Sequence, residues 1–261
     1  MLSFLLQTIV PFLLSALVVV IITIIAERFG TKVGGILGTL PSTIVIAFLF
    51  IALTNSINFA VESVSIVPAE MGINLIFLML FAVLAYKSFK LAVVGSLGVW
   101  TVLSFILYLS NLNIFLIAVA FYIIALLSTF IILEKGVKIP SMGRRYVQYS
   151  AIKIMMRGII AGLVIAVAVV LSNISPILSG IFSVFPAIFL STMIISYREH
   201  GPNFVGGMAK SMIFGTPSVT SYAVAIYFLY PAIGVILGSF IAYCVGILMT
   251  VILFSIRQKF R

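Results

Sequence analysis

The sequence predicts an all-α polytopic membrane protein of about nine transmembrane helices, arranged as two inverted four-helix repeats joined by a linker helix. The class follows from composition and pattern: 64% of the 261 residues are hydrophobic and 8% are charged. Apolar stretches of about 20 residues, the length that crosses a bilayer, recur along the chain. The duplication follows from a motif that occurs twice. A membrane β-barrel would show short alternating strands instead.

The apolar stretches predict where the chain crosses the membrane. The N-terminal stretch has no basic segment before it and no small-residue cleavage site after it, so we interpret it as a first span and not as a signal peptide. The predicted spans are residues 4–26, 33–53, 57–86, 90–109, 112–133, 151–172, 177–197, 205–229 and 231–256.

The basic residues predict the orientation of these spans. The formal net charge is +10, and all fifteen Lys and Arg residues fall on one side of the predicted membrane. Basic loops stay on the cytoplasmic side, so we expect a multi-pass protein of the cytoplasmic (inner) membrane with its N-terminus outside and its C-terminus inside. The expected partners are the lipid bilayer and a small solute or cation, without nucleic acid, and a homo-oligomer is left open.

The repeated motif is a span with a proline near its middle. Gly34–Leu53 reads GGILGTLPSTIVIAFLFIAL and contains Pro41, and Gly180–Ile195 reads GIFSVFPAIFLSTMII and contains Pro186, 145 residues later. One extra span between the copies turns the second copy upside down, which is the inverted repeat of many secondary transporters. The predicted parts are unit one at 1–111, a linker helix with a cytoplasmic loop at 112–150, and unit two at 151–261.

The second unit carries a resemblance to a known family. Ser179-Gly180, Phe185-Pro186, the run from Tyr197 to Gly201 (YREHG) and Gly238-Ser239 resemble the GlpM-like family of small bacterial inner-membrane proteins with four spans. The resemblance implies an architecture and no settled activity: this chain looks like a fused version of two such units with a reversing helix between them. The first unit departs from the pattern because it carries Glu62 and Glu70.

Glu70 is the most informative single residue. It lies near the midpoint of the third predicted span, where a charged side chain costs about 2.5–3.5 kcal/mol on insertion scales. A carboxylate at that depth binds a proton or pairs with a cation, which predicts a coupling-ion or substrate site. The alternative is a span that begins near Val67, with Pro68 as helix starter and Glu70 at the outer interface. Asn74 follows on the same helix face, and Glu62 is expected at the surface.

Prolines and hydroxyls complete the predicted site. Pro41, Pro186 and Pro217 each fall within a span, where proline removes a backbone donor and frees a carbonyl that protein, water or ligand must satisfy. The alternative is a simple kink, in which a Ser or Thr hydroxyl donates to the freed carbonyl. The predicted substrate or ion site comprises Glu70, Asn74, Thr39, Pro41, Ser42, Thr43, Ser183, Pro186, Thr216, Pro217 and Ser218.

Two features of the sixth span have their own interpretations. Gly158 and Gly162, four residues apart, predict close helix packing. Arg157 lies about two turns inside this span, so we expect its side chain to reach back to the cytoplasmic surface. The alternative is an anion anchor at the inner mouth of the protein.

The motifs that the sequence lacks reduce the number of functional classes to consider. The sequence has no phosphate-binding Gly-Lys-Ser/Thr loop, no His/Cys cluster with zinc spacing, no Asp and a single His, so we expect no enzyme, no cofactor, no catalytic residues and no metal site. The predicted function is a secondary transporter or facilitator with a midplane site between the inverted repeats, lined by spans two, three, seven and eight, and coupled to a cation or proton through Glu70.

Two alternatives from other classes stay open. One is a non-transporting scaffold or assembly component of an envelope system, whose midplane would be packed dry. The other is a lipid flippase, for which Arg144, Arg145 and Arg157 would attract anionic headgroups at the inner surface. A flippase would open its groove sideways to lipid, whereas a transporter needs a water-accessible cavity that reaches Glu70.

Overall fold

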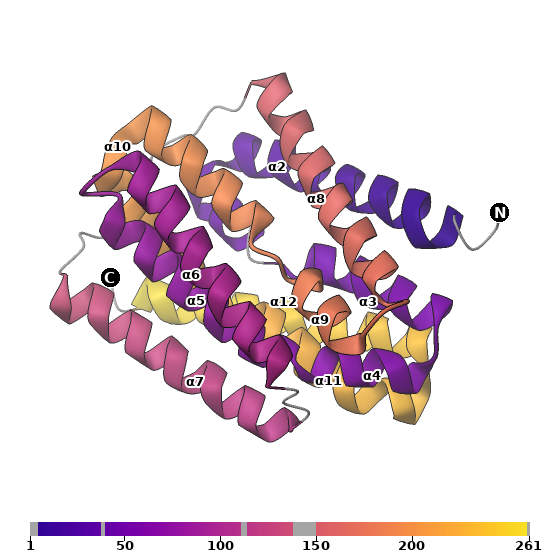
Figure 1. Cartoon of the computed structure of the whole chain (residues 1–261). Coiled ribbons are helices and arrows are strands. Elements are labelled where there is room, and N and C mark those ends of the chain that lie inside the picture. The colour runs from indigo at the N-terminus through magenta and orange to yellow at the C-terminus, as the bar shows by residue number, and fades with distance from the viewer. Residues whose placement is uncertain (1–4, 38–39, 111–113, 138–149, 260–261) are drawn as a thin grey trace.

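The computed structural model describes residues 5–37, 40–110, 114–137 and 150–259 (Figure 1). Within these ranges every regular element is a helix and no strand occurs. Seven helical segments of this part are long and apolar enough to cross a membrane, and Ser42–Thr54 is a shorter apolar helix. The prediction of an all-α polytopic membrane protein is therefore confirmed.

The helices follow one another with short connections. Before the linker, the elements are η1 (Leu5–Ile9), α2 (Val10–Leu37), α3 (Ser42–Thr54), α4 (Ile57–Ser65), α5 (Val67–Leu84) and α6 (Phe89–Leu109). The linker helix is α7 (Phe115–Ile131) with the π-helical turn η2 (Ile132–Gly136). After it come α8 (Ala151–Leu171), α9 (Pro176–Ser183), α10 (Ala187–Gly215), α11 (Pro217–Ile233) and α12 (Val235–Lys259).

The second predicted span differs from the structure. Helix α2 continues to Leu37, so the first residues of the predicted span 33–53 belong to it, and the rest of that span is α3, only 13 residues long. Residues 27–32, which include charged residues, lie between two predicted spans, but charged side chains are compatible with a helix. Pro41 is not, because its ring removes a backbone donor and clashes with the preceding turn. The interruption therefore comes at the proline.

The seventh and eighth predicted spans lie in one apolar helical stretch of 58 residues, Pro176–Ile233. Gly201 interrupts this stretch with φ 76° and ψ −176°, so α10 consists of two helices, 187–200 and 202–215. A positive φ of this size is readily adopted only by glycine, which lacks a Cβ atom. Pro202 follows directly and begins the second helix, a position where its missing N–H costs nothing.

Contacts between the two predicted units are reciprocal. By their place in the units, α3 corresponds to the first half of α10, α4 to its second half, α5 to α11 and α6 to α12. Helix α4 packs on α11, and α10, which contains the counterpart of α4, packs on α5, the counterpart of α11. Likewise, α3 packs on α8 and α12, and α10, which also contains the counterpart of α3, packs on α2 and α6. Such exchanged contacts are expected of two equivalent units that face each other across a two-fold axis.

Glycines bring α2 and α8 into backbone contact. A Cβ atom built on Gly158 would lie 2.9 Å from the Ala16 carbonyl oxygen, and one on Gly162 would lie 2.6 Å from that of Phe12. Any larger residue would push the two helices apart. The close packing predicted from this glycine pair is therefore confirmed.

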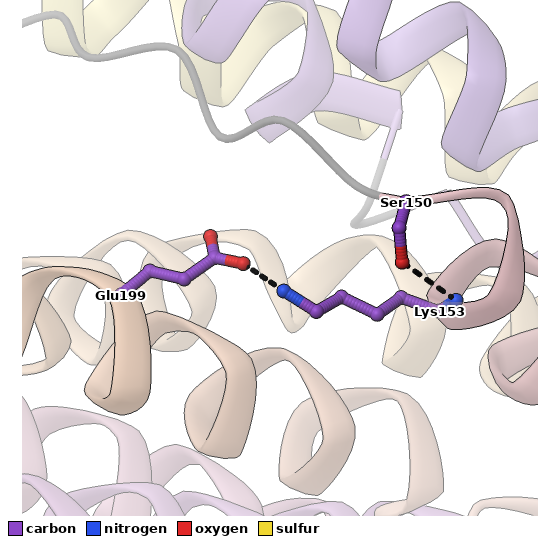
Figure 2. A network of polar contacts seen from close by, with 3 residues as sticks. All are labelled: Ser150, Lys153 and Glu199. Carbon is purple, nitrogen blue, oxygen red and sulfur yellow. Dashed lines mark hydrogen bonds and ion pairs between the residues drawn. The ribbon is translucent and has the colours of Figure 1, made fainter.

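One ion pair joins the start of α8 to α10. The Ser150 hydroxyl caps α8 by accepting the Lys153 N–H over 3.4 Å, and the Lys153 ammonium pairs with the Glu199 carboxylate (Figure 2). The two side chains are 40% and 22% exposed, so water screens their attraction.

Because of this screening, Lys153→Gln is expected to lower the free energy of unfolding by less than about 1 kcal/mol. The change can be measured by denaturation with sodium dodecyl sulfate in mixed micelles, followed by far-UV circular dichroism. Glu199→Gln should give a loss of the same size. A loss above about 2 kcal/mol would mean that the pair is effectively shielded from water.

Candidate functional site

The two repeated prolines form the same local structure. Pro41 has φ −76° and ψ 42°, and Pro186 has φ −75° and ψ 35°. In both cases the N–H of the next residue donates to the carbonyl of the residue before the proline, over 2.8 Å at Pro41 and 2.7 Å at Pro186. This is an inverse γ-turn. A helix begins directly after each turn, α3 after Pro41 and α10 after Pro186.

The two proline turns line one cavity of about 70 Å³, which is large enough for a few water molecules. Its wall comes from the α2–α3 and α9–α10 breaks, from α8, and from single residues of α5 and α11. Spans two, three, seven and eight were expected to line the site, and α8 of span six joins them. The lining includes Pro41, Thr43, Met71, Ser183, Pro186 and Val219.

A third break lies between α4 and α5, at Ile66. Glu70 is in the first turn of α5, and its side chain is fully buried. The position of Glu70 combines features of both sequence interpretations, and its role as a coupling-ion or substrate site stays a prediction. The helix begins at Val67 with Pro68 in its first turn, as the interfacial alternative required, but α4 precedes it directly and Glu70 is buried. A carboxylate in this place lies at the positive end of the α5 dipole. Glu62, in contrast, is exposed.

Two sets of hydrogen bonds link α5 to α6 and to the α9–α10 break. The Ser104 hydroxyl donates to Glu70 Oε1 over 2.8 Å. The Trp100 indole N–H donates to Asn74 Oδ1 over 3.0 Å, and Asn74 Nδ2 donates to the Val184 carbonyl over 2.8 Å. Glu70 Oε2 is buried and has no hydrogen-bond partner within the described residues. The amide of Asn74 therefore ties α5 and α6 to the wall of the cavity.

Each proline turn is covered by the last helix of the other unit. The Trp100 ring of α6 meets Phe185, next to Pro186, edge-on with ring centroids 4.8 Å apart. At the first turn, Gly246 of α12 lies so close that an added Cβ would be 2.7 Å from Pro41 Cγ. The cavity is therefore held between helices of both units.

The fourth break, at Thr216, is a separate feature. The Thr216 hydroxyl donates to the carbonyl three residues earlier over 2.9 Å and shares a 2.9 Å hydrogen bond with the Tyr122 hydroxyl of α7. Ser218 donates to the carbonyl three residues before it over 2.9 Å. The hydroxyls thus satisfy carbonyls beside Pro217, the first residue of α11, which matches the simple-kink interpretation at this position.

The structure divides the predicted site residues into groups. Four of them, Pro41, Thr43, Ser183 and Pro186, line the cavity, and Ser42 begins α3 beside it. Asn74 reaches the cavity wall at Val184, while Glu70 lies one turn away with its carboxyl bonded to α6. The group at the fourth break, Thr216, Pro217 and Ser218, is not part of the lining. Thr39, Arg144 and Arg145 lie outside the described residues.

The partners of the predicted site residues in this network are residues that the sequence did not predict for the site. Trp100, Ser104 and Tyr122 are all buried and all bond to predicted site residues. One signal was available: Trp100 is the single Trp of the chain and lies within an apolar span, and a buried indole N–H requires an acceptor. Ser104, four residues later, shares its helix face.

The chain matches a known family over part of its length. A family described as "Protein of unknown function (DUF3147)" matches residues 8–113, which nearly coincide with predicted unit one and include the Pro41 turn and Glu70. No curated protein and no solved structure matches the chain. The chain is thus similar over its first unit to an uncharacterised family, and this match does not carry the GlpM-like name.

Proposed function

We propose that the protein is a secondary transporter or facilitator whose substrate site is the cavity between the Pro41 and Pro186 turns. The observation that carries this proposal is that two turns of the same geometry, from two predicted units of opposite orientation, line one cavity. In inverted-repeat transporters, broken helices present backbone groups to the substrate, and the two halves exchange roles as the site opens to either side.

Glu70 is the group that we assign to coupling. No ion pair within the described part of the chain includes it, and a buried carboxyl is accommodated by binding a proton or a cation. Asn74, one turn further on α5, bonds to Val184 in the cavity wall. A change at Glu70 can therefore reach the substrate site through one helix turn and one hydrogen bond.

We propose the topology that the basic residues predict, with the N-terminus outside and the C-terminus in the cytoplasm. The start of α2 and the end of α12 lie on opposite sides of the molecule (Figure 1), as this topology requires. The family match covers one predicted unit, which agrees with a fused pair of four-span units. A relation to GlpM-like proteins stays a prediction within this proposal.

Cysteine accessibility tests the proposal. Thr43→Cys and Ser183→Cys are made in a Cys244→Ser background, because Cys244 is a free, exposed thiol. Each is treated with a small charged methanethiosulfonate reagent from either side of the membrane. We expect both positions to react from both sides. Val102→Cys on α6, 57% exposed on the outer surface of the bundle, is the control and should stay unlabelled in lipid.

Other outcomes separate the alternatives. If neither Thr43→Cys nor Ser183→Cys reacts, the centre is dry and the scaffold alternative replaces transport. Reaction from one side only contradicts alternating access. Reaction with a lipid-soluble maleimide but not with the charged reagent favours a groove open to lipid, and hence a flippase.

A further inference from the structure

Glu70 and three neighbouring side chains form a polar cluster between α5 and α6. Glu70 and Asn74 are one turn apart on α5, and Trp100 and Ser104 are one turn apart on α6. The Ser104 hydroxyl donates to Glu70 Oε1 over 2.8 Å, and the Trp100 N–H donates to Asn74 Oδ1 over 3.0 Å. All four residues are buried, so the cluster is shielded from water outside the bundle.

The hydrogen bonds of the Glu70 carboxyl fit a neutral acid. An ionised carboxylate has about four acceptor sites, and leaving a buried charged group short of partners costs more than leaving a neutral group so. Within the described residues, Oε1 accepts the bond from Ser104, whereas Oε2 is buried and has no partner. The structure therefore accommodates Glu70 best with a proton on Oε2.

The surroundings of this carboxyl do not favour a metal cation. Hard cations in proteins are held by about six or more oxygen ligands, whereas an indole N–H such as that of Trp100 is a donor only. Glu70 lies in the first turn of α5, where the helix dipole is positive and repels a cation. In the part of the chain that the structure describes, no group of three or more His, Cys, Asp or Glu side chains could hold a metal ion.

No charged side chain among the described residues balances Glu70. The helices packed on α5 are α4, α6, α7, α9, α10 and α11, and the side chains that influence the ionisation of the carboxyl are two neutral donors, Ser104 and Trp100. The other titratable groups of these helices are engaged or exposed elsewhere. Glu62, Lys90 and Arg198 are exposed, Glu199 and Lys210 are in ion pairs, His200 packs on Phe204, and the Tyr122 hydroxyl bonds to Thr216.

The Trp100 indole has a single N–H and two acceptors in its range. In the structure it donates to Asn74 Oδ1, and the second acceptor is the Glu70 carboxyl one turn away. A hydrogen bond to an ionised acceptor is about twice as strong as one between neutral groups. We therefore expect the N–H to move from Asn74 to Glu70 when the carboxyl loses its proton.

We infer that the coupling ion is a proton bound to Glu70 Oε2, and that the Trp100 N–H switches from Asn74 to Glu70 when this proton leaves. This inference rests on the proposed function and names its coupling ion. On release, the O–H bond breaks, its electron pair stays on the carboxylate, and the proton passes to a water molecule. Asn74 then loses a bond that fixes its amide, which loosens its hold on the Val184 carbonyl beside the Pro186 turn.

Infrared absorption of the purified full-length protein in detergent tests the proton. A protonated carboxyl group has a C=O stretching band that a carboxylate lacks, and exposed glutamates are ionised at neutral pH. We expect this band in the wild type at neutral pH, its loss as the pH is raised, and its absence in Glu70→Gln. Glu62→Gln, the same substitution at an exposed glutamate of α4, is the matched control and should keep the band.

Salts distinguish a proton from a metal cation at Glu70. Sodium, potassium and choline chloride are compared at equal ionic strength and constant pH, and all three should leave the band unchanged. Loss of the band with sodium or potassium but not with choline would show that a cation displaces the proton. That result would overturn the inference, as would a wild-type protein without the band or a band that persists in Glu70→Gln.

Trp100→Phe tests the switch while Glu70 stays in place. The variant removes a donor to the ionised carboxylate, so its carboxyl band should persist to higher pH than in the wild type. A purely structural role of Trp100 would leave this titration unchanged and reject the switch.

The reaction rate of Ser183→Cys relative to that of Thr43→Cys reports the cavity wall. Both variants carry Cys244→Ser, and Thr43→Cys, at the other proline turn, corrects for the pH dependence of the thiol itself. As the band disappears, this ratio should change by at least about fivefold, the lower end of usual coupling between sites. In Glu70→Gln it should stay constant with pH, and a constant ratio in the wild type would reject the switch.

The outcomes separate this inference from the proposed function. Thr43→Cys and Ser183→Cys that react from both sides of the membrane, with no carboxyl band from Glu70, would leave transport standing and reject the proton. A titrating band that Glu70→Gln removes, with neither cysteine reactive, would leave the proton site standing and reject transport.

Discussion

Replacing Gly180 with alanine is expected to destabilise the protein by about 3 kcal/mol or more, at or above the upper end of the usual cost of overpacking. An added Cβ atom would lie 2.1 Å from the Ser63 carbonyl oxygen and 2.6 Å from Ile66 Cγ2. The first of these is a backbone atom of α4 and cannot rotate away. Helix α9 would have to move off the α4–α5 break, which also displaces the α9–α10 turn at the cavity.

Gly98→Ala is the matched control for this change. Gly98 lies on an exposed face of α6, and no atom comes within 4 Å of an added Cβ. The same methyl group should there be neutral or stabilise the helix by up to about 1 kcal/mol. Far-UV circular dichroism during heating in detergent gives the apparent Tm of both variants. Equal Tm values would contradict the close approach of α9 to α4.

Replacing Asn74 with leucine is expected to cost about 2–6 kcal/mol, because it leaves two buried groups without partners at about 1–3 kcal/mol each. These groups are the Val184 carbonyl and the Trp100 indole N–H. The Val184 carbonyl lies in the connection between α9 and α10, so the loss of its hydrogen bond also loosens the cavity wall. Unfolding by sodium dodecyl sulfate in mixed micelles measures the change.

A double-mutant cycle tests whether the loss arises from this network. Trp100→Phe removes the indole donor but keeps an aromatic ring beside Phe185. If the hydrogen bond between the two residues causes the loss of stability, the free energy of unfolding of the double variant should fall by less than the sum of the losses of the two single variants. The reason is that donor and acceptor disappear together. Additive losses would mean that Trp100 and Asn74 act independently.

The fold class and the proline turns could be predicted from the sequence because their causes are local. A protein that crosses a bilayer requires long apolar stretches, and each stretch can be recognised in the sequence independently of the others. Proline blocks a helix by its own covalent structure, so the motif around Pro41 and Pro186 located both turns. Gly201 and Pro202 likewise fell in a predicted connection between spans, and the structure places the interruption of α10 there.

The burial of Glu70 could not be decided from the sequence, because it depends on the neighbouring helices. Whether Glu70 lies at an interface or inside the bundle depends on how α4 continues into α5, and a single residue, Ile66, separates the two helices. The partners of Asn74 are equally non-local: Trp100 is on the next helix, and Val184 is in the other predicted unit. Such pairings follow from helix register and packing, which the hydrophobic periodicity along the sequence does not reveal.

The position of Trp100 has a practical consequence. As the single Trp of the chain, it accounts for all indole fluorescence of the protein. Its N–H is bonded to Asn74, and its ring lies edge-on against Phe185 in the wall of the cavity. Movement of the α9–α10 turn changes both contacts, and with them the emission wavelength and quantum yield. The unmodified protein, once purified, therefore contains an optical reporter of this turn, which can be read in detergent or reconstituted lipid without a label.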